Sequence, residues 1–473
     1  MKSGPGIANN VAIYAVARVT KNLLTFAYFV IIARYAGVRV AGLFFLVLAY
    51  GTLYLTLTDF GFTNVFIRDT ARHPEDIQKN FSKTLSVKLL FIAILLALTL
   101  VAFNILDYPP ITKTLVYIVV ASQILRSLSL SFFGCFRAVQ QMQYEAIGMV
   151  VGGLITLSGG AIAIYLELSV YYLILAVALD GLFNFIYSAV LVARKLQLVP
   201  RLAFSSRDVA SLVPIALPFG LSAVFMTIYS IDTVLVSRFM DETHVAWYSI
   251  ASRLVGGMKL IPITLATVLF PAFSAFHLTD PEGMMVIFRR SERFLMFLVI
   301  PMSAGGVLLA APIIEAIFGA DYSESVLPFQ IMCVALVPIF LSFPVISLLN
   351  AIGGQNGNVA NLAVAIAVHV SASLILIPNL GIEGAALSFT VSNLTLLILC
   401  QYQARRLVDW GPWASLLRPI GLSTAAMIAT VWTLRDFLYL PIVIALGVFV
   451  YVGGMVVMRG GESVFGVRKM TGV

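Results

Sequence analysis

Long apolar stretches recur along almost the whole chain, and they restrict its fold more than any other feature. Each covers about 18–25 residues, enough for a helix to cross the hydrocarbon core of a bilayer. A segment in lipid must satisfy its own backbone hydrogen bonds, so such a chain folds as a bundle of spanning helices. We predict fourteen spans, with the approximate bounds Val11–Ala36, Val40–Asp59, Leu85–Ile105, Leu115–Phe136, Ala146–Leu166, Tyr171–Ala193, Val213–Val236, Val245–Phe273, Phe294–Phe318, Val326–Leu349, Val359–Ile377, Ile382–Tyr402, Trp413–Leu434 and Leu438–Met458.

The composition indicates the same class. Of 473 residues, 60% are hydrophobic and only 11% are charged, with a mean hydropathy of +0.99. A soluble domain carries about twice that share of charge. Cys135, Cys333 and Cys400 lie in apolar segments without a CxxC pair, which favours buried small residues over disulfides or a zinc site. We therefore predict an all-α polytopic membrane protein that needs no metal and no cofactor.

Basic residues are distributed unevenly between the two sets of loops. Loops on the side of the N-terminus hold 19 of the 30 Lys and Arg, whereas the opposite loops and segment ends hold five. The positive-inside rule then places both termini in the cytoplasm. This placement also accounts for the net charge of +8 without a nucleic-acid partner. Met1–Asn10 is short and polar, and the first apolar stretch is too long for a cleavable signal peptide.

Short motifs recur in the same order and indicate an internal repeat. Ala33-Arg34, Ala41-Gly42 and His73-Pro74 are followed some 205 residues later by Ser237-Arg238, Ala246-Trp247 and Asp280-Pro281. Two units of six spans share one orientation and are related by an axis along the membrane normal. We predict an N-terminal lobe of helices 1–6 at residues 1–203 and a C-terminal lobe of helices 7–12 at 204–410, around a central cavity. Two further helices occupy 411–473.

Five cationic side chains lie inside spans that are otherwise apolar: Arg18, Lys21, Arg126, Arg253 and Lys259. An ionisable group at membrane depth costs at least roughly 2.5–3.5 kcal/mol, so it usually faces a bundle interior or a wet cavity. Five charges of the same sign favour a site for an anionic ligand.

The first span carries a polar stripe. Tyr14, Arg18, Lys21, Thr25 and Tyr28 alternate at spacings of four and three, which places them on one helical face. A water-filled lumen explains this stripe better than lipid does. The alternative is that both cations extend toward cytoplasmic headgroups.

The eighth span carries a second polar group. Ser249 and Arg253 share a face, whereas Lys259 is rotated away from them, and Pro262 follows closely. A bend at the proline would point both cations into one lumen. The alternative is close packing with one cation at the rim. Arg126 on the fourth span is the weakest of the five candidates.

Three acids also lie in spans, at Asp59, Asp180 and Asp232. Each either binds a coupling proton or sodium ion or neutralises a nearby cation. Asp232 and Arg253 form a natural pair between consecutive helices, and a structural ion pair is the commoner arrangement. His369 is better explained as a hydrogen-bonded bundle histidine than as a proton relay.

Several motifs are absent from the sequence. It has no GxxxxGK[ST] phosphate-binding loop, so the chain carries no ATPase of its own. No Asp-x-Asp or Glu-x-Asp stands in an external loop to hold a metal–sugar phosphate, and no loop exceeds about 25 residues. A membrane glycosyltransferase or ligase is therefore disfavoured, and we expect no enzyme.

Two groups of motifs carry a resemblance to a known family. The first group is Ala33-Arg34-Tyr35-Ala36-Gly37, Ala41-Gly42-Leu43-Phe44 and Asp59-Phe60-Gly61-Phe62, continuing through Asn64 to Arg68-Asp69 and Ala71-Arg72; the second is Pro218, Asp232, Tyr248, Arg253, Pro262 and Phe270-Pro271. Both groups resemble Wzx-type polysaccharide flippases of the multidrug/oligosaccharidyl-lipid/polysaccharide exporter superfamily, and the resemblance covers essentially the whole chain.

The resemblance implies a two-lobed transporter in the cell membrane. Its substrate would be an undecaprenyl-pyrophosphate-linked oligosaccharide used for O-antigen of lipopolysaccharide, exopolysaccharide or capsule biosynthesis. Implied partners are membrane lipids, a polymerase, a chain-length regulator and coupling H⁺ or Na⁺.

The closest alternatives belong to the same superfamily. A peptidoglycan lipid-precursor flippase also handles a lipid pyrophosphate. A multidrug exporter would favour an acidic, aromatic lumen, which the buried cations oppose.

Overall fold

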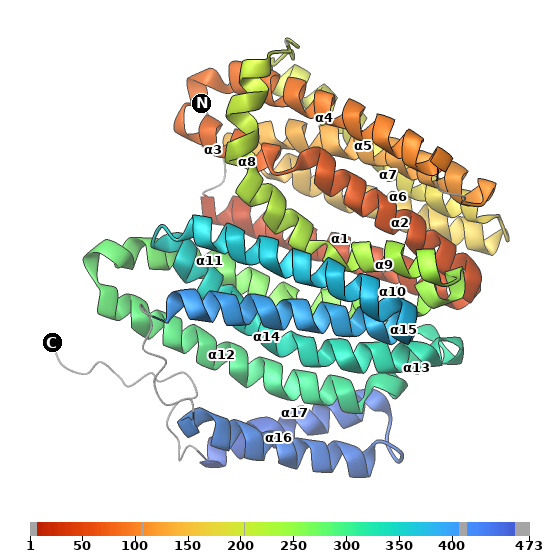
Figure 1. Cartoon of the computed structure of the whole chain (residues 1–473), viewed down its shortest axis with the longest axis vertical. Helices are drawn as coiled ribbons and strands as arrows, with labels where there is room; N and C mark the ends of the chain where they lie inside the picture. Colours follow the sequence, from red (N-terminus) through yellow and green to blue (C-terminus); the bar gives the residue numbers. More distant parts are fainter. Residues whose placement is uncertain (1–6, 106–107, 203, 406–413, 459–473) are drawn as a thin grey trace. The chain divides into compact units, whose positions relative to one another are not determined.

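The computed structural model describes residues 7–105, 108–202, 204–405 and 414–458, and these residues form helices without a strand (Figure 1). Thirteen continuous helical segments among the described residues are long and apolar enough to cross a membrane, and some of them, such as Val38–Arg72, join two of the helices named below. The helices are α1 (Ile7–Tyr35), α2 (Val38–Asp59), α3 (Phe62–Arg72), α4 (Ile77–Ile105), α5 (Pro110–Ala138), α6 (Gln143–Tyr165), α7 (Val170–Leu191), α8 (Ser206–Met226), α9 (Ile228–Phe239), α10 (Glu242–Met258), α11 (Leu260–Thr279), α12 (Pro281–Leu308), α13 (Ala310–Phe318), α14 (Val326–Ala351), α15 (Gln355–Ala404), α16 (Ala414–Leu434) and α17 (Leu440–Met458).

The long α15 contains two of the predicted spans. Gly381, with φ 65° and ψ −138°, interrupts it in a conformation that glycine adopts readily. Asn361 donates to Gln403 (2.8 Å), although a straight helix would hold residues so far apart roughly 60 Å from each other. The ring of His369 also contacts Ser392 (3.3 Å). The two arms therefore fold back as an antiparallel hairpin, and the prediction of fourteen spans is confirmed among the described residues.

Three predicted spans have different boundaries in the structure. The seventh is divided into α8 and α9 at Thr227, and the ninth begins earlier and is divided into α12 and α13 at Leu309. The eighth is divided into α10 and α11 at Lys259. Pro262 has no N–H to donate to the carbonyl of Met258, which explains why the helix is interrupted there. The apolar pattern missed these breaks because all flanking turns are equally apolar.

The chain divides into two compact units, residues 1–246 and 247–473. In the first unit, α1 packs on α6, α6 on α7, α7 on α5 and α5 on α2, while α8 packs against α2 and α3 and α9 against α2. In the second unit, α14 packs on α12 and α15, and the pair α16–α17 packs on α12. Tyr451 of α17 donates to the carbonyl of Phe297 (2.8 Å). The lobe boundaries at 203 and 410 remain a prediction, and both residues lie outside the described ones.

Element lengths follow the predicted repeat. Helix α1 corresponds to α8 with α9, α2 with α3 to α10 with α11, and α4 to α12 with α13. Helix α5 then corresponds to α14, and α6 and α7 to the two arms of α15. Proline opens the helical segment at Pro74 and again at Pro281, where its missing N–H costs nothing. The described helices therefore follow the six-plus-six-plus-two order.

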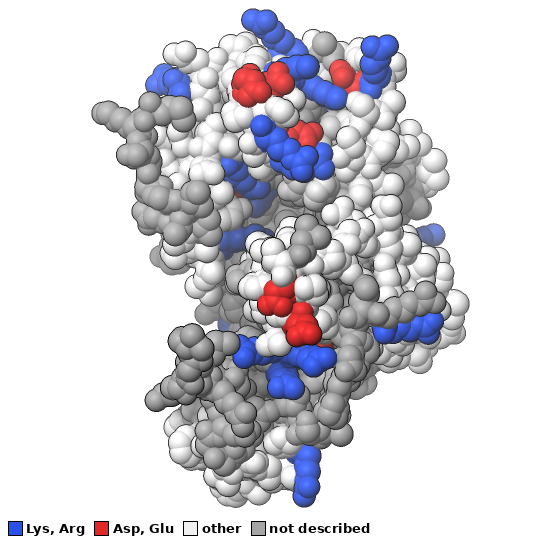
Figure 2. Space-filling model, turned by 90° about the vertical axis from the view of Figure 1, so that its left-hand side faces the viewer, with Lys and Arg blue, Asp and Glu red and all other residues white. Residues whose placement is uncertain are grey.

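One end of the first unit is rich in basic residues. Three contacts join neighbouring segments there: Asn10 donates to the carbonyl of Gln140, Gln78 to that of Val199, and Lys83 to the hydroxyl of Ser211. Figure 2 shows several Lys and Arg side chains, with Asp and Glu among them, on the face turned toward the viewer. This placement agrees with the loop assignment behind the predicted orientation. Lys2, Arg406, Arg459, Arg468 and Lys469 of that assignment lie outside the described residues.

Candidate anion-binding site

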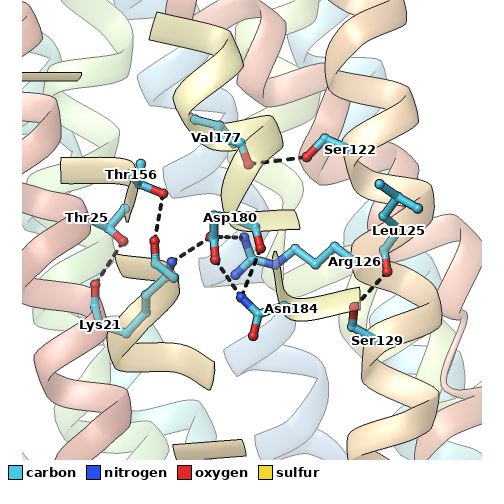
Figure 3. A network of polar contacts seen from close by, with 11 residues as sticks. Lys21, Thr25, Ser122, Leu125, Arg126, Ser129, Thr156, Val177, Asp180 and Asn184 are labelled. Atoms are coloured by element: carbon cyan, nitrogen blue, oxygen red, sulfur yellow. Dashed lines mark hydrogen bonds and ion pairs between the residues drawn. The ribbon is translucent and has the colours of Figure 1, made fainter. Parts of the chain in front are cut away.

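Two of the five predicted cations converge on one acid. Lys21 of α1 donates to Oδ2 of Asp180 on α7 at 2.7 Å, and Arg126 of α5 reaches the same oxygen at 3.5 Å (Figure 3). Asn184, one turn along α7, donates to Oδ1 of Asp180 at 2.7 Å. The side chain of Asp180 is only 4% exposed, that of Lys21 13% and that of Arg126 39%. The cluster therefore has two cations, one carboxylate and an opening at Arg126.

The cluster lies near the middle of its helices. Asp180 is ten residues from the start of α7 and eleven from its end, roughly 15 Å from each at helical rise. Arg126 and Lys21 also lie in the central turns of their helices. That depth is close to the centre of a hydrocarbon core about 30 Å thick, where unpaired charge is most costly.

A glycine on α6 makes room for the carboxylate. A Cβ on Gly152 would collide with Oδ1 of Asp180 and lie 2.6 Å from Nδ2 of Asn184. Small residues at such positions let membrane helices approach closely. Gly152 therefore lets α6 lie directly against the side chains of Asp180 and Asn184 on α7.

The rest of the first-span stripe is distributed differently from the prediction. Tyr14 lies under the guanidinium of Arg137 (5.5 Å from ring centroid), and the hydroxyl of Thr25 donates to the carbonyl of Lys21. Arg18 is exposed and forms no salt bridge with any described residue. Tyr28 is a correction: it is 1% exposed and donates to the carbonyl of Leu173 at 2.6 Å, so it packs inside the unit and does not line a lumen.

The structure contains a second buried ion pair that was not predicted from the sequence. Lys88 of α4 is fully buried and donates to Asp59 (2.6 Å), to the carbonyl of Ser127 (2.7 Å) and to the hydroxyl of Ser131 (3.0 Å). Asp59 also accepts from Thr63 (2.5 Å). Of the two predicted roles for Asp59, the structure supports charge pairing. The sequence signal was weak because Lys88 lies near the end of its span, where a lysine can extend to headgroups.

A third pair was missed at the base of α5. Arg137 forms a two-pronged salt bridge with Glu145 of α6, whose side chain is 2% exposed. Arg137 is one of the 19 basic residues assigned to the loops on the side of the N-terminus, so its pairing with Glu145 was not predicted. The loop between α5 and α6 is short and folds back onto the bundle.

The second unit holds the remaining predicted residues of the eighth span. The ammonium of Lys259 lies at the α10–α11 break, 4.4 Å from the ring centroid of Phe389. Ser249 is 2% exposed, and its place in a lumen remains a prediction. Arg253 is partly buried. Asp232 belongs to the first unit and is fully buried, and its pairing with Arg253 remains a prediction.

A cavity of about 160 Å³ lies elsewhere in the first unit. Its lining includes Tyr108, Thr112, Arg238 and Glu242, near the end opposite to the basic loops. None of the five predicted cations lines it. The charge arrangement, rather than this cavity, therefore defines the candidate site.

The arrangement can neutralise one anionic group. Lys21 and Asp180 form a close, buried pair, and the surplus positive charge lies on Arg126, which is more exposed. Besides Arg126 on α5, a further exposed cation is Arg18 on α1, three residues before Lys21. A guanidinium matches the geometry of phosphate oxygens.

Solved structures with this fold are transporters. The chain has a TM-score of 0.77 and 16% identity to the lipid II flippase MurJ in an inward closed conformation, covering 95% of this chain and 99% of that one. For an inward-facing multidrug resistance MATE family transporter of the MOP superfamily the TM-score is 0.67 at 15% identity, over 84% and 96%. For a MOP superfamily transporter from Pyrococcus furiosus it is 0.58 at 15% identity, over 85% and 95%. At these identities the likeness establishes the fold alone, that of a multi-pass, all-α membrane protein.

The family follows from the sequence model of polysaccharide biosynthesis proteins, which matches residues 7–277, more than half of the chain. The chain belongs to this family, and the resemblance to polysaccharide flippases of the MOP superfamily is confirmed. No curated protein matches the chain.

Proposed function

We propose that the chain is a flippase that moves undecaprenyl-pyrophosphate-linked oligosaccharide repeat units across the cytoplasmic membrane for surface polysaccharide biosynthesis. The observation that carries the proposal is the Lys21–Asp180–Arg126 cluster, a site of net positive charge at mid-depth of the helices. A glycan on a pyrophosphate cannot cross hydrocarbon unaided. Cations at this depth lower the barrier for the pyrophosphate while the lipid tail remains in the bilayer.

Transport in this proposal is by alternating access, with the two lobes rocking about a cationic lumen. Arg18, Arg126 and Arg253 meet the anionic group, and Lys259 adds charge at the α10–α11 break. Both termini lie in the cytoplasm. A proton or sodium gradient drives the cycle, and a polymerase and a chain-length regulator use the product.

Reconstituted flipping tests the cationic lumen. Arg18→Ala and Arg253→Ala are each expected to lower the flipping rate of an undecaprenyl-pyrophosphate glycan in proteoliposomes by about tenfold or more, because each removes a charge-assisted hydrogen bond. Arg→Lys at the same positions retains part of the rate. Arg39→Ala is a matched control, since the Arg39 side chain is 81% exposed and makes only a surface pair with Glu242. Wild-type rates in both lumen variants would refute the cationic lumen.

A peptidoglycan lipid-precursor flippase is the second candidate, because the MurJ structure has the same fold over 95% of this chain. Lipid analysis of a deletion strain separates the two. The polysaccharide proposal expects one lipid-linked oligosaccharide of a surface polymer to accumulate on the cytoplasmic leaflet with normal cell-wall synthesis. Accumulation of the peptidoglycan precursor would favour the second candidate.

A further inference from the structure

The two cations of the cluster are held unequally by Asp180. The Lys21 contact is short (2.7 Å) and its side chain is 13% exposed, whereas the Arg126 contact is long (3.5 Å) and its side chain is 39% exposed. Arg126 makes this one polar contact among the described residues. Since a guanidinium has several N–H donors, most of its donors are left for a ligand.

The carboxylate of Asp180, in contrast, is fixed from all sides. Oδ2 accepts from Lys21 and Arg126, and Oδ1 accepts from Asn184. The surface of α6 at Gly152 lies directly against Oδ1. A carboxylate held in this way cannot follow Arg126 outward, so any displacement within the cluster is made by the arginine.

We propose that Arg126 exchanges Asp180 for the phosphate of the substrate, and that Asp180 is a built-in competitor for this arginine. The inference rests on the proposed function. Asp180 acts through Arg126 as a positioning residue: it retains the guanidinium when no anion is bound and takes it back when the anion leaves. A transport site must bind strongly enough to load and weakly enough to unload. The competing carboxylate sets that limit.

A double substitution isolates the competition from the net charge. Lys21→Met with Asp180→Asn removes one positive and one negative charge, so the cluster keeps a net charge of +1 while Arg126 loses its competitor. We expect undecaprenyl pyrophosphate to bind about tenfold more tightly. Flipping at saturating substrate should slow, because release becomes harder. A purely structural role for Asp180 would not tighten binding.

The Asp59–Lys88 pair supplies a matched control. It is also a buried lysine–aspartate contact (2.6 Å) in the same unit, and no arginine in the described part of the chain forms a salt bridge with Asp59. Lys88→Met with Asp59→Asn should leave the affinity for undecaprenyl pyrophosphate unchanged. Arg126→Gln provides a second measurement with the Lys21–Asp180 pair intact, and it should weaken binding about tenfold with an unchanged melting temperature.

Binding is measured for folded full-length protein with two probes, undecaprenyl pyrophosphate and inorganic pyrophosphate. Unchanged or weaker binding in the Lys21/Asp180 double variant, or wild-type binding in Arg126→Gln, overturns the inference. A further outcome is that the double variant binds inorganic pyrophosphate more tightly than wild-type protein does, while wild-type protein flips no lipid-linked glycan. In that case the proposed function fails and the competition between Asp180 and the anion stands. Wild-type protein that binds neither probe overturns both.

Discussion

At the residue scale, the cations that lie inside the predicted spans meet different surroundings. Lys21 and Lys88 are enclosed and paired with aspartates, whereas Arg18 is exposed and Arg126 is half-exposed. Spacing along one helix identified the charged face of α1. It could not identify the partners, because Asp180 lies 159 residues from Lys21 and is brought to it by the packing of α1, α6 and α7.

The close approach at Gly152 gives a residue-scale prediction. Gly152→Ala places a methyl group where Asp180 and Asn184 now lie, and such overpacking costs about 1–3 kcal/mol. We expect a lower melting temperature in detergent and slower flipping. Gly421→Ala is the control, since a Cβ there meets nothing within 4 Å and alanine favours the helix. Equal melting temperatures for the two variants would contradict the close packing.

At the element scale, helix number and order were predictable, but helix interruptions were only partly so. The apolar stretches gave fourteen spans because length and polarity are local properties. The break at Thr227 leaves no mark in the apolar pattern, whereas the break at Leu309 is followed three residues later by Pro312, which has no N–H to donate to the carbonyl of Leu308. The break at Lys259 was predictable from Pro262, because a missing N–H is a covalent property of the sequence.

Pro262 therefore offers an element-scale prediction. Pro262→Ala restores the N–H that can bond to the carbonyl of Met258, so that one further backbone hydrogen bond can form and α10 can continue into α11. The melting temperature should rise. Flipping should slow, because Lys259 would no longer lie at an interruption between α10 and α11. Thermal unfolding and the proteoliposome rate measure the two effects, and an unchanged rate would show that the break has no part in transport.

At the scale of the whole molecule, the all-α fold and the family are established, whereas the grouping of the helices into lobes and the orientation remain predictions. The basic loops gather at one end of the first unit, and Arg39, Thr112 and Glu242 lie toward the other. This separation is what a positive-inside orientation requires.

Two single cysteines test that orientation without changing any Lys or Arg. His73→Cys lies between α3 and α4, Thr114→Cys lies in the first turns of α5, and α4 separates them. We expect a membrane-impermeant thiol reagent added outside spheroplasts to label only Thr114→Cys. Background is low because Cys135, Cys333 and Cys400 are buried. Labelling of His73→Cys from outside would reverse the topology.

The tight turn at Gly381 has a consequence for how the protein enters the membrane. No Lys or Arg occurs between Phe294 and Ala404, so neither arm of the α15 hairpin carries an orientation signal of its own. Because the turn at Gly381 is so short, one arm cannot insert into the membrane while the other remains in water. Both arms must leave the translocon as a pair, and their direction is inherited from Arg293 before them and Arg405 after them. The orientation of both arms therefore depends on residues that lie outside the arms themselves.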